Sequence, residues 1–326
     1  MRAAWYEETG TARDVLKVGE RPDPVAGPGE VVVRIHASGV NPSDVKARAG
    51  ARGPIAFPYV IPHSDGAGVI EAVGEGVDAS RIGERVWTWN AAWQRKDGTC
   101  AEYVCLPAEQ AVHLPDGTGF AAGACLGIPA LTAAYGVFAD GEIAGKTVLV
   151  TGGAGAVGHY AIQFAKWGGA QVLTTVSGEA KAGLASHAGA DHVINYREQD
   201  MAQAVLEATD GNGVDRIVEV EFGGNLDATR QIIRAGGAIA TYGSMADPNP
   251  AIPFYELMFK NVTLRMFLVY LLQGEARSGT IARIIRALEE GALQHTIAHS
   301  FALEDIAAAH ETVEAGTAIG NVVVTV

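Results

Sequence analysis

The stretch Val148-Leu149-Val150-Thr151-Gly152-Gly153-Ala154-Gly155-Ala156-Val157-Gly158 decides the fold of this chain. Its valine-rich start predicts a buried parallel strand, and a Gly-x-Gly-x-x-Gly pattern (Gly153, Gly155, Gly158) follows at once. The next residues, as far as Gly168, place apolar side chains at helical spacing. Strand, tight turn and helix in this order predict a dinucleotide site, because N–H groups at the helix N-terminus can bind a pyrophosphate. A plain structural turn is the alternative.

The next predicted strand, residues 170–176, indicates which dinucleotide is bound. NAD-dependent proteins usually place an acidic residue at this strand end, where it binds the ribose 2′-hydroxyl. Here Val176 and Ser177 are uncharged, and the first acid, Glu179, lies beyond them. Lys181 could bind a 2′-phosphate through its positive charge, although it could also be a solvated helix residue. The sequence therefore favours NADPH.

The composition limits the class of protein. The chain has 326 residues, enough for about two domains, and 48% of them are hydrophobic. A formal net charge of −13, without a Lys/Arg cluster, argues against nucleic acid binding. Charged residues interrupt the N-terminus, so no signal peptide is expected, and the longest apolar stretch, 266–272, is too short to span a membrane. Three cysteines without an export signal predict reduced thiols and a cytoplasmic location.

The order of the predicted elements divides the chain. Residues 1–125 are rich in short β-strands, whereas strands and helices alternate from 126 to 265, which specifies a parallel, doubly wound α/β sheet. The tail, 266–326, adds two helices and a closing strand. We therefore expect one domain formed by 1–125 and 266–326, and a dinucleotide-binding domain formed by 126–265. The strands predicted for the second domain are 147–150, 171–176, 192–195, 216–219 and 238–242.

Several short motifs follow one another along nearly the whole chain. They are Gly39-Val-Asn-Pro-Ser-Asp44, Ser64-Asp-Gly-Ala-Gly-Val-Ile-Glu-Ala-Val-Gly74, Gly83-Glu-Arg-Val86, Gly127-Ile-Pro-Ala-Leu-Thr132 and the Gly153–Gly158 loop. In these motifs the chain resembles the medium-chain dehydrogenase/reductase superfamily, and most of all its zinc-free quinone oxidoreductase branch, typified by zeta-crystallin. The resemblance implies a GroES-like β-barrel domain split by a Rossmann domain. It also implies a homodimer whose two Rossmann sheets join edge to edge.

The resemblance further implies which residues form the site. Asn41 matches the family's active-site asparagine, which would position the substrate or the nicotinamide; a turn residue before Pro42 is the alternative. The residues at positions that contact the cofactor in the family are Lys46, Thr132, Ala154, Gly155, Ala156, Val157, Ser177, Lys181, Tyr196, Gly243, Ser244, Leu268, Tyr270 and Asn321. Lys46 and Asn321 depart from the family pattern, in which a tyrosine and a lysine are common.

The same motif positions predict no metal site. Asn41, Ser64 and about Ile128 stand where zinc-dependent members carry their ligands, and none of them is a strong zinc ligand. His63 lies one residue from the ligand histidine and is expected to be a loop residue. Without a Lewis acid, alcohol oxidation is not expected, whereas hydride transfer from NADPH to an electron-poor acceptor stays feasible.

The sequence thus predicts an NADPH-dependent, zinc-independent reductase whose partner is a small-molecule quinone. An alkenal, enone or enoyl reductase is the alternative on the same fold. A non-enzymatic nucleotide- or RNA-binding protein is the alternative of a different class, and the acidic net charge argues against it. Glu219 and Glu221 end a predicted strand near the cofactor edge, and we interpret them as structural or ribose-facing, with a substrate-facing role as the alternative.

Overall fold

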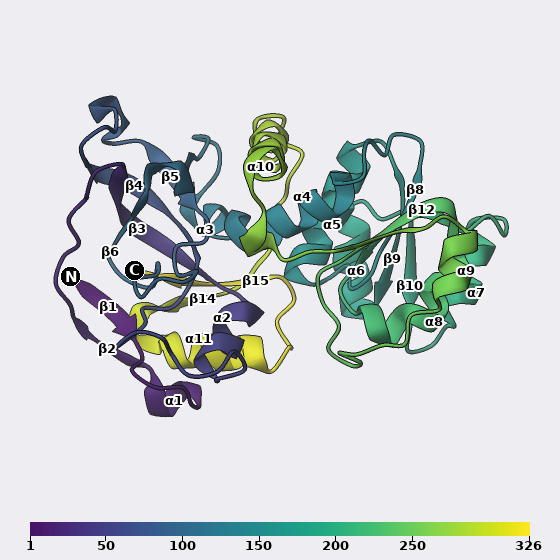
Figure 1. The fold of residues 1–326 in the computed structure, drawn as a ribbon, viewed down its shortest axis with the longest axis horizontal. Helices are drawn as coiled ribbons and strands as arrows, with labels where there is room; N and C mark the ends of the chain where they lie inside the picture. Colours follow the sequence, from purple (N-terminus) through teal and green to yellow (C-terminus); the bar gives the residue numbers. More distant parts are fainter. The chain divides into compact units, whose positions relative to one another are not determined.

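The computed structural model describes residues 1–326, and the chain folds into two compact units (Figure 1). Unit 1 comprises Met1–Ile128 and His295–Val326, and unit 2 comprises Pro129–Gln294. The second boundary differs from the predicted one, because residues 266–294 belong to unit 2. There, helix α10 (Gly274–Glu289) packs against helix α4 (Leu131–Phe138) instead of joining the tail to unit 1.

Unit 2 is built on six parallel strands in the order β10-β9-β8-β11-β12-β13. The strands are β8 (Thr147–Val150), β9 (Gln171–Val176), β10 (His192–Asn195), β11 (Val214–Glu219), β12 (Ile233–Thr241) and β13 (Thr263–Met266). Strands β9 and β10 are added on one side of β8, and strands β11 to β13 are added on the other side. This strand order is that of a doubly wound dinucleotide-binding sheet, and its switch point lies between β8 and β11. The predicted fold class is therefore confirmed, and a ligand site is expected at the carboxyl ends of β8 and its neighbours.

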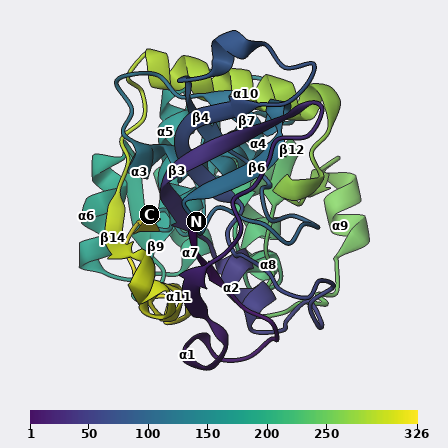
Figure 2. The same ribbon diagram turned by 90° about the vertical axis from the view of Figure 1, so that its left-hand side faces the viewer.

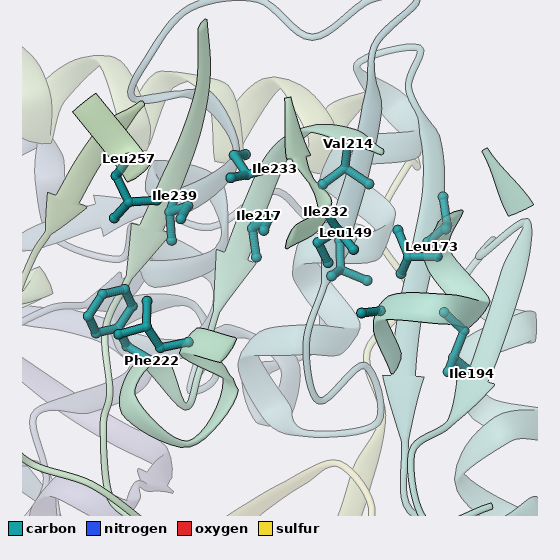
Figure 3. Close-up of a cluster of buried hydrophobic side chains, with 13 residues drawn as sticks. Leu149, Leu173, Ile194, Val214, Ile217, Phe222, Ile232, Ile233, Ile239 and Leu257 are labelled. Carbon is teal, nitrogen blue, oxygen red and sulfur yellow. The ribbon is translucent and has the colours of Figure 1, made fainter. Parts of the chain in front are cut away.

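Helices cover both faces of this sheet (Figure 1). Besides α4 and α10, the helices of unit 2 are α5 (Ala156–Trp167), α6 (Glu179–His187), α7 (Met201–Ala208), α8 (Phe222–Ile232), α9 (Phe254–Phe259) and the single turn η4 (Val269–Leu271); the π-helical turn η3 (Leu126–Ala130) leads into α4. On one face, Leu149, Ile217 and Ile239 form a row across neighbouring strands and pack against Phe222 of α8 and Leu257 of α9 (Figure 3). Because the strands of a parallel sheet are buried on both faces, all four residues of β8 are buried and three of them are apolar.

The strands of unit 1, several of which are labelled in Figure 2, pair mainly in antiparallel fashion. Its main sheet has the order β14-β15-β3-β4-β5-β7. Strand β6 pairs with residues 30–34 of β3, whereas β15 pairs with residues 37–40 of the same strand, and β1 pairs with β2. Its strands are β1 (Arg2–Trp5), β2 (Lys17–Glu20), β3 (Glu30–Val40), β4 (Asp65–Val73), β5 (Arg85–Thr88), β6 (Tyr103–Pro107), β7 (Ala111–His113), β14 (Ile297–Ala302) and β15 (Asn321–Thr325). Its helices are α1 (Ala12–Val15), α2 (Pro42–Arg48), α3 (Phe120–Gly123) and α11 (Ile306–Glu314), with short turns η1 (Ala79–Arg81), η2 (Ala108–Gln110) and η5 (Leu303–Asp305).

The long strand β3 holds unit 1 together. It pairs with β4, β6 and β15, and its Val31, Val33 and Ile35 side chains are buried with Ile70 of β4 and Leu106 of β6. This alternation of buried residues is what a strand with one face on the core requires. None of the helices in either unit combines the length and apolarity that crossing a membrane would need.

Candidate active site

The loop between β8 and α5 leads directly into the N-terminus of a helix. Gly155 is the N-cap of α5, and the N–H groups of Ala156, Val157 and Gly158 open the helix, where no intrahelical acceptor exists for them. Such N–H groups, together with the positive end of the helix dipole, attract an anion. The structure therefore brings together Ala154, Gly155, Ala156 and Val157 in one loop at the carboxyl end of β8, and their binding of a phosphate stays a prediction.

Two crowded glycines explain the sequence of this loop. A Cβ atom on Gly158 would collide with the carbonyl oxygen of Gly152, and one on Gly153 would collide with the Thr174 hydroxyl. Gly152 itself has a φ of +68°, in the left-handed region. Only glycine fits these contacts, so the close packing of loop, helix and strand depends on the pattern found in the sequence.

Two acids, the buried Glu219 and the half-buried Glu221, brace the loop and the turn beside it. The Thr151 hydroxyl donates to Glu219 Oε1 (2.7 Å), and Asn225 Nδ2 donates to the same oxygen (2.9 Å). Glu221 accepts hydrogen bonds from the backbone N–H groups of Met245 (2.8 Å) and Ala246 (3.0 Å). Burial raises the pKa of Glu219 above its ordinary value. These contacts favour the structural interpretation of both glutamates.

The carboxyl ends of β9 and β10 bring three predicted residues together. Lys181 Nζ donates to Ser177 Oγ (3.0 Å), and both residues are half-buried. The Tyr196 N–H donates to the carbonyl oxygen of Val176 (3.1 Å), which places Tyr196 beside the end of β9 with an exposed ring. The ammonium and hydroxyl groups thus lie side by side, and their role toward a phosphate stays a prediction.

A cavity of about 480 Å³ opens at the carboxyl ends of β12 and β13. Gly243, Ser244 and Leu268, all predicted from the sequence, line it. Most of the other lining residues are apolar, and sequence reasoning missed them: Phe222, Pro248, Pro250, Ile252, Met266, Phe267 and Leu271. These residues could have been found from the sequence only by recognising that β13 is a strand beside β12, because the cavity lies where these two strands end. Tyr270 and Thr132 are buried and lie outside this lining.

The remaining predicted residues lie in unit 1. Asn41 is buried as the N-cap of α2, and its Nδ2 donates to Asp65 Oδ2 (2.8 Å), a contact that the sequence did not suggest. Lys46 is exposed on the same helix. Asn321 is buried, and its Nδ2 donates to the carbonyl oxygen of Thr296 (3.3 Å). Roles for these three residues toward a cofactor stay predictions from the resemblance.

The residues at and beside the positions that carry zinc ligands in zinc-dependent members make other contacts. His63 Nδ1 hydrogen-bonds with Ser38 Oγ (2.8 Å) and its Nε2 with His310 Nε2 (3.0 Å), so both ring nitrogens are engaged. Burial lowers the pKa of both histidines. The Asn41 amide faces a carboxylate, and no group of three or more His, Cys, Asp or Glu side chains is arranged to hold a metal ion. The donor set does not fit a catalytic zinc, which needs three strong ligands.

The buried Asp44, whose Oδ2 accepts the Asn41 N–H (2.8 Å), predicts a pH dependence of stability. Burial raises its pKa in the folded protein from 3.8 to about 7. Its contribution to stability is therefore full below pH 3.8 and is lost as the pH rises through about 7. Asp44→Asn removes this titration. Relative to wild type, the variant's free energy of unfolding should rise between about pH 5 and pH 7, by up to ~1.4 kcal/mol per pH unit, and then level off.

Chemical denaturation over that pH range measures the difference, and Asp116→Asn, an exposed aspartate of the same unit, is the control. The control should differ from wild type by the same amount at every pH. A difference between Asp44→Asn and wild type that does not change with pH would contradict the assignment of a buried, neutral Asp44.

Comparison with known proteins places this site in a family. Residues 27–116 match the family model of the alcohol dehydrogenase GroES-like domain, and residues 156–288 match that of zinc-binding dehydrogenases. Human quinone oxidoreductase is 32% identical over 325 residues, which cover 97% of this chain and 95% of the human protein. A 2-haloacrylate reductase from a Burkholderia species is 31% identical over 309 residues, covering 91% of each chain.

The solved structures agree with this result. A mycobacterial protein, whose structure contains NADPH, superimposes over 100% of both chains with a TM-score of 0.88 and 31% identity. The match extends through both units, from the GroES-like region to the dinucleotide-binding sheet. The chain therefore belongs to the medium-chain dehydrogenase/reductase superfamily, in its quinone oxidoreductase branch.

Proposed function

We propose that this protein is an NADPH-dependent, zinc-independent quinone reductase. The observation that carries the proposal is the pair formed by Lys181 and Ser177 at the end of β9, beside the phosphate loop of α5. No carboxylate ends β9, where Val176 is the last residue, so a 2′-phosphate meets donors and no repelling charge. The human relative supports the acceptor, and the mycobacterial relative supports the cofactor.

The residues of the chain bind and orient the reactants. The N–H groups at the start of α5 would hold the pyrophosphate, and Ser177 and Lys181 would hold the 2′-phosphate. The cavity at the ends of β12 and β13, with its mostly apolar lining, would hold the nicotinamide end. Bound NADPH supplies a hydride from its nicotinamide C4. That hydride, together with one proton from solvent, would convert a quinone to a hydroquinone.

A second acceptor class has support of its own. The Burkholderia relative is a 2-haloacrylate reductase, so it acts on a carbon–carbon double bond conjugated to a carboxyl group. Reduction of an activated alkene by this protein is therefore the alternative. It needs a proton at carbon after hydride transfer, which a quinone does not need.

Parallel assays with 1,4-benzoquinone, 9,10-phenanthrenequinone and an enone distinguish the two acceptor classes. The absorbance of NADPH is followed while each acceptor is added at the same concentration. We expect a kcat/KM for the quinones at least about tenfold above that for the enone, which is a difference of about 1.4 kcal/mol in barrier. The reverse order would establish the alkene reductase, and no turnover of any acceptor would favour a binding function.

The protein acts as a homodimer in this proposal. Strand β13 is the edge of the sheet and pairs only with β12, so its other side offers free backbone groups to a second copy. Beside it, Met266 and the α9 residues Phe254, Tyr255 and Phe259 expose large apolar side chains. A continuous sheet across a two-fold axis would pair the edges and cover these side chains.

Sedimentation velocity tests the dimer. Phe259→Glu should sediment as a monomer at concentrations where the wild type is a dimer, because it buries a charge in the interface. Val25→Glu, a substitution of the most exposed large apolar residue of unit 1, is the control and should stay dimeric. A wild-type protein that is monomeric throughout would refute this assembly.

The three cysteines are unpaired, which accords with a reducing, cytoplasmic location.

A further inference from the structure

Arg277 occupies a position that helix stability does not explain. It lies in the first turn of α10, near the positive end of the helix dipole, where a cation is unfavourable. Its side chain is also buried, with 6% exposed, and a buried charge is costly unless hydrogen bonds replace its water. The reason for an arginine here lies in what its guanidinium contacts.

The guanidinium binds three backbone carbonyl groups of one short segment. Nη2 donates to the carbonyl oxygens of Val269 (2.8 Å) and Tyr270 (3.3 Å), and Nε donates to that of Leu272 (3.2 Å). The planar guanidinium presents its N–H groups in a fixed, forked arrangement. These bonds therefore fix where the carbonyl groups lie, in addition to supplying a positive charge beside them. One side chain thereby fixes the backbone of η4 and the residue that follows it.

The same segment forms a wall of the cavity at the ends of β12 and β13. Val269 and Tyr270 are buried, whereas Leu268 and Leu271 expose their side chains and line the cavity with Gly243 and Ser244. A single 3₁₀ turn has few hydrogen bonds of its own; here Leu271 N–H donates to Leu268 (2.9 Å) and Leu272 N–H to Val269 (3.3 Å). The bonds from Arg277 therefore supply much of what holds this wall in place.

We propose that Arg277 is a positioning residue, which fixes the 268–272 wall and so sets how tightly the cavity holds the nicotinamide end of NADPH and the acceptor beside it. This inference rests on the proposed function for the identity of the ligand, but not for the state of the wall. It concerns residues of unit 2 alone. Arg277 itself touches the backbone of the wall, and its effect on the ligand passes through Leu268 and Leu271.

Hydrogen exchange of the ligand-free protein tests the first part. Arg277→Met removes all three bonds, and amides of residues 268–273 should exchange at least roughly tenfold faster than in the wild type. Arg277→Lys should give an intermediate exchange rate, because one ammonium group cannot reproduce the fixed, forked arrangement of the guanidinium N–H groups. The control is Arg286→Met, the same substitution on the same helix at an exposed arginine that pairs with Glu290 (2.7 Å). It should leave the exchange of the segment unchanged.

Ligand binding tests the second part. Arg277→Met should weaken NADPH binding and raise the KM for the quinone several-fold, with a smaller change in kcat. Binding of adenosine 2′,5′-bisphosphate should not change, because that ligand carries the 2′-phosphate recognised by Ser177 and Lys181 but no nicotinamide. Equal weakening of both ligands would overturn the proposal, since it would indicate a general loss of structure in unit 2.

The exchange measurement keeps the two hypotheses apart. Unchanged exchange at 268–273 in Arg277→Met overturns the positioning role, whatever the enzyme reduces. If the wild type turns over no quinone, the exchange and binding measurements still decide the role of Arg277. If Arg277→Met does not fold, the exchange and binding measurements on Arg277→Lys decide the role of Arg277. A Lys variant that matches the wild type in both measurements would refute the proposal that the guanidinium positions this segment.

Discussion

Gly158→Ala is expected to weaken NADPH binding by roughly 10- to 1,000-fold, the effect of losing one or two hydrogen bonds to charged phosphate groups. The added Cβ atom would collide with the carbonyl oxygen of Gly152. This oxygen is a backbone atom, so it cannot move aside by rotation of a side chain. The loop and the start of α5 must then move apart, and the N–H groups of Ala156 and Val157 no longer converge on one anion. Fluorescence titration with NADPH measures the loss.

The control for this experiment is Gly183→Ala. Gly183 lies in α6, and a Cβ atom there would meet nothing within 4 Å. The substitution should leave NADPH affinity unchanged and stabilise the helix by about 1 kcal/mol, the difference in helix propensity between glycine and alanine. Gly158→Ala with wild-type affinity would show that the loop does not bind the pyrophosphate.

Ser177→Asp is expected to lower the preference for NADPH over NADH by at least about 100-fold in kcat/KM, or about 2.7 kcal/mol. The new carboxylate would repel a 2′-phosphate and, with NADH, would accept a hydrogen bond from the ribose 2′-hydroxyl. It would also face Lys181, whose Nζ lies 3.0 Å from Ser177 Oγ, and would neutralise the charge that attracts the phosphate. Initial rates with both cofactors and one quinone give the ratio.

Two further variants separate charge from shape. Lys181→Ala should lower the preference in the same direction by a smaller factor, and this preference should weaken as salt is added. Lys166→Ala, which removes an ion pair with Asp191 (2.8 Å) elsewhere in unit 2, should leave the ratio unchanged. An unaltered ratio in both Ser177→Asp and Lys181→Ala would mean that the cofactor is not selected at the end of β9.

The sequence predicted those parts of the fold whose signal is local. Strands β8, β9 and β10 have the predicted bounds, because each is a short segment with adjacent Val, Leu or Ile residues that is followed by a turn or bend. Strand β13 was missed, since its four residues adjoin the apolar stretch 266–272 and alternate only weakly between exposed and half-buried. That omission moved the predicted domain boundary, because β13 commits the chain after it to unit 2.

The site follows the same rule. The Gly153–Gly158 loop, Ser177 and Lys181 could be named as candidates because each lies within a few residues of a predicted strand end, and their binding roles stay predictions. The partner of Asn41 could not, since Asp65 lies 24 residues away on a neighbouring strand. The bonds of Arg277 to 269, 270 and 272 are close in the sequence, yet nothing in an amphipathic helix pattern marks an arginine as facing inward.

The measurement that tests the central claim most directly is the rate of NADPH oxidation by 1,4-benzoquinone, using protein dialysed against a chelator and compared with NADH. We expect rapid oxidation that needs the protein, prefers NADPH over NADH, and is unaffected by the chelator or by added zinc. Each NADPH consumed should yield one hydroquinone. Oxidation of NADH alone, or activity that appears only when zinc is restored, would contradict the account.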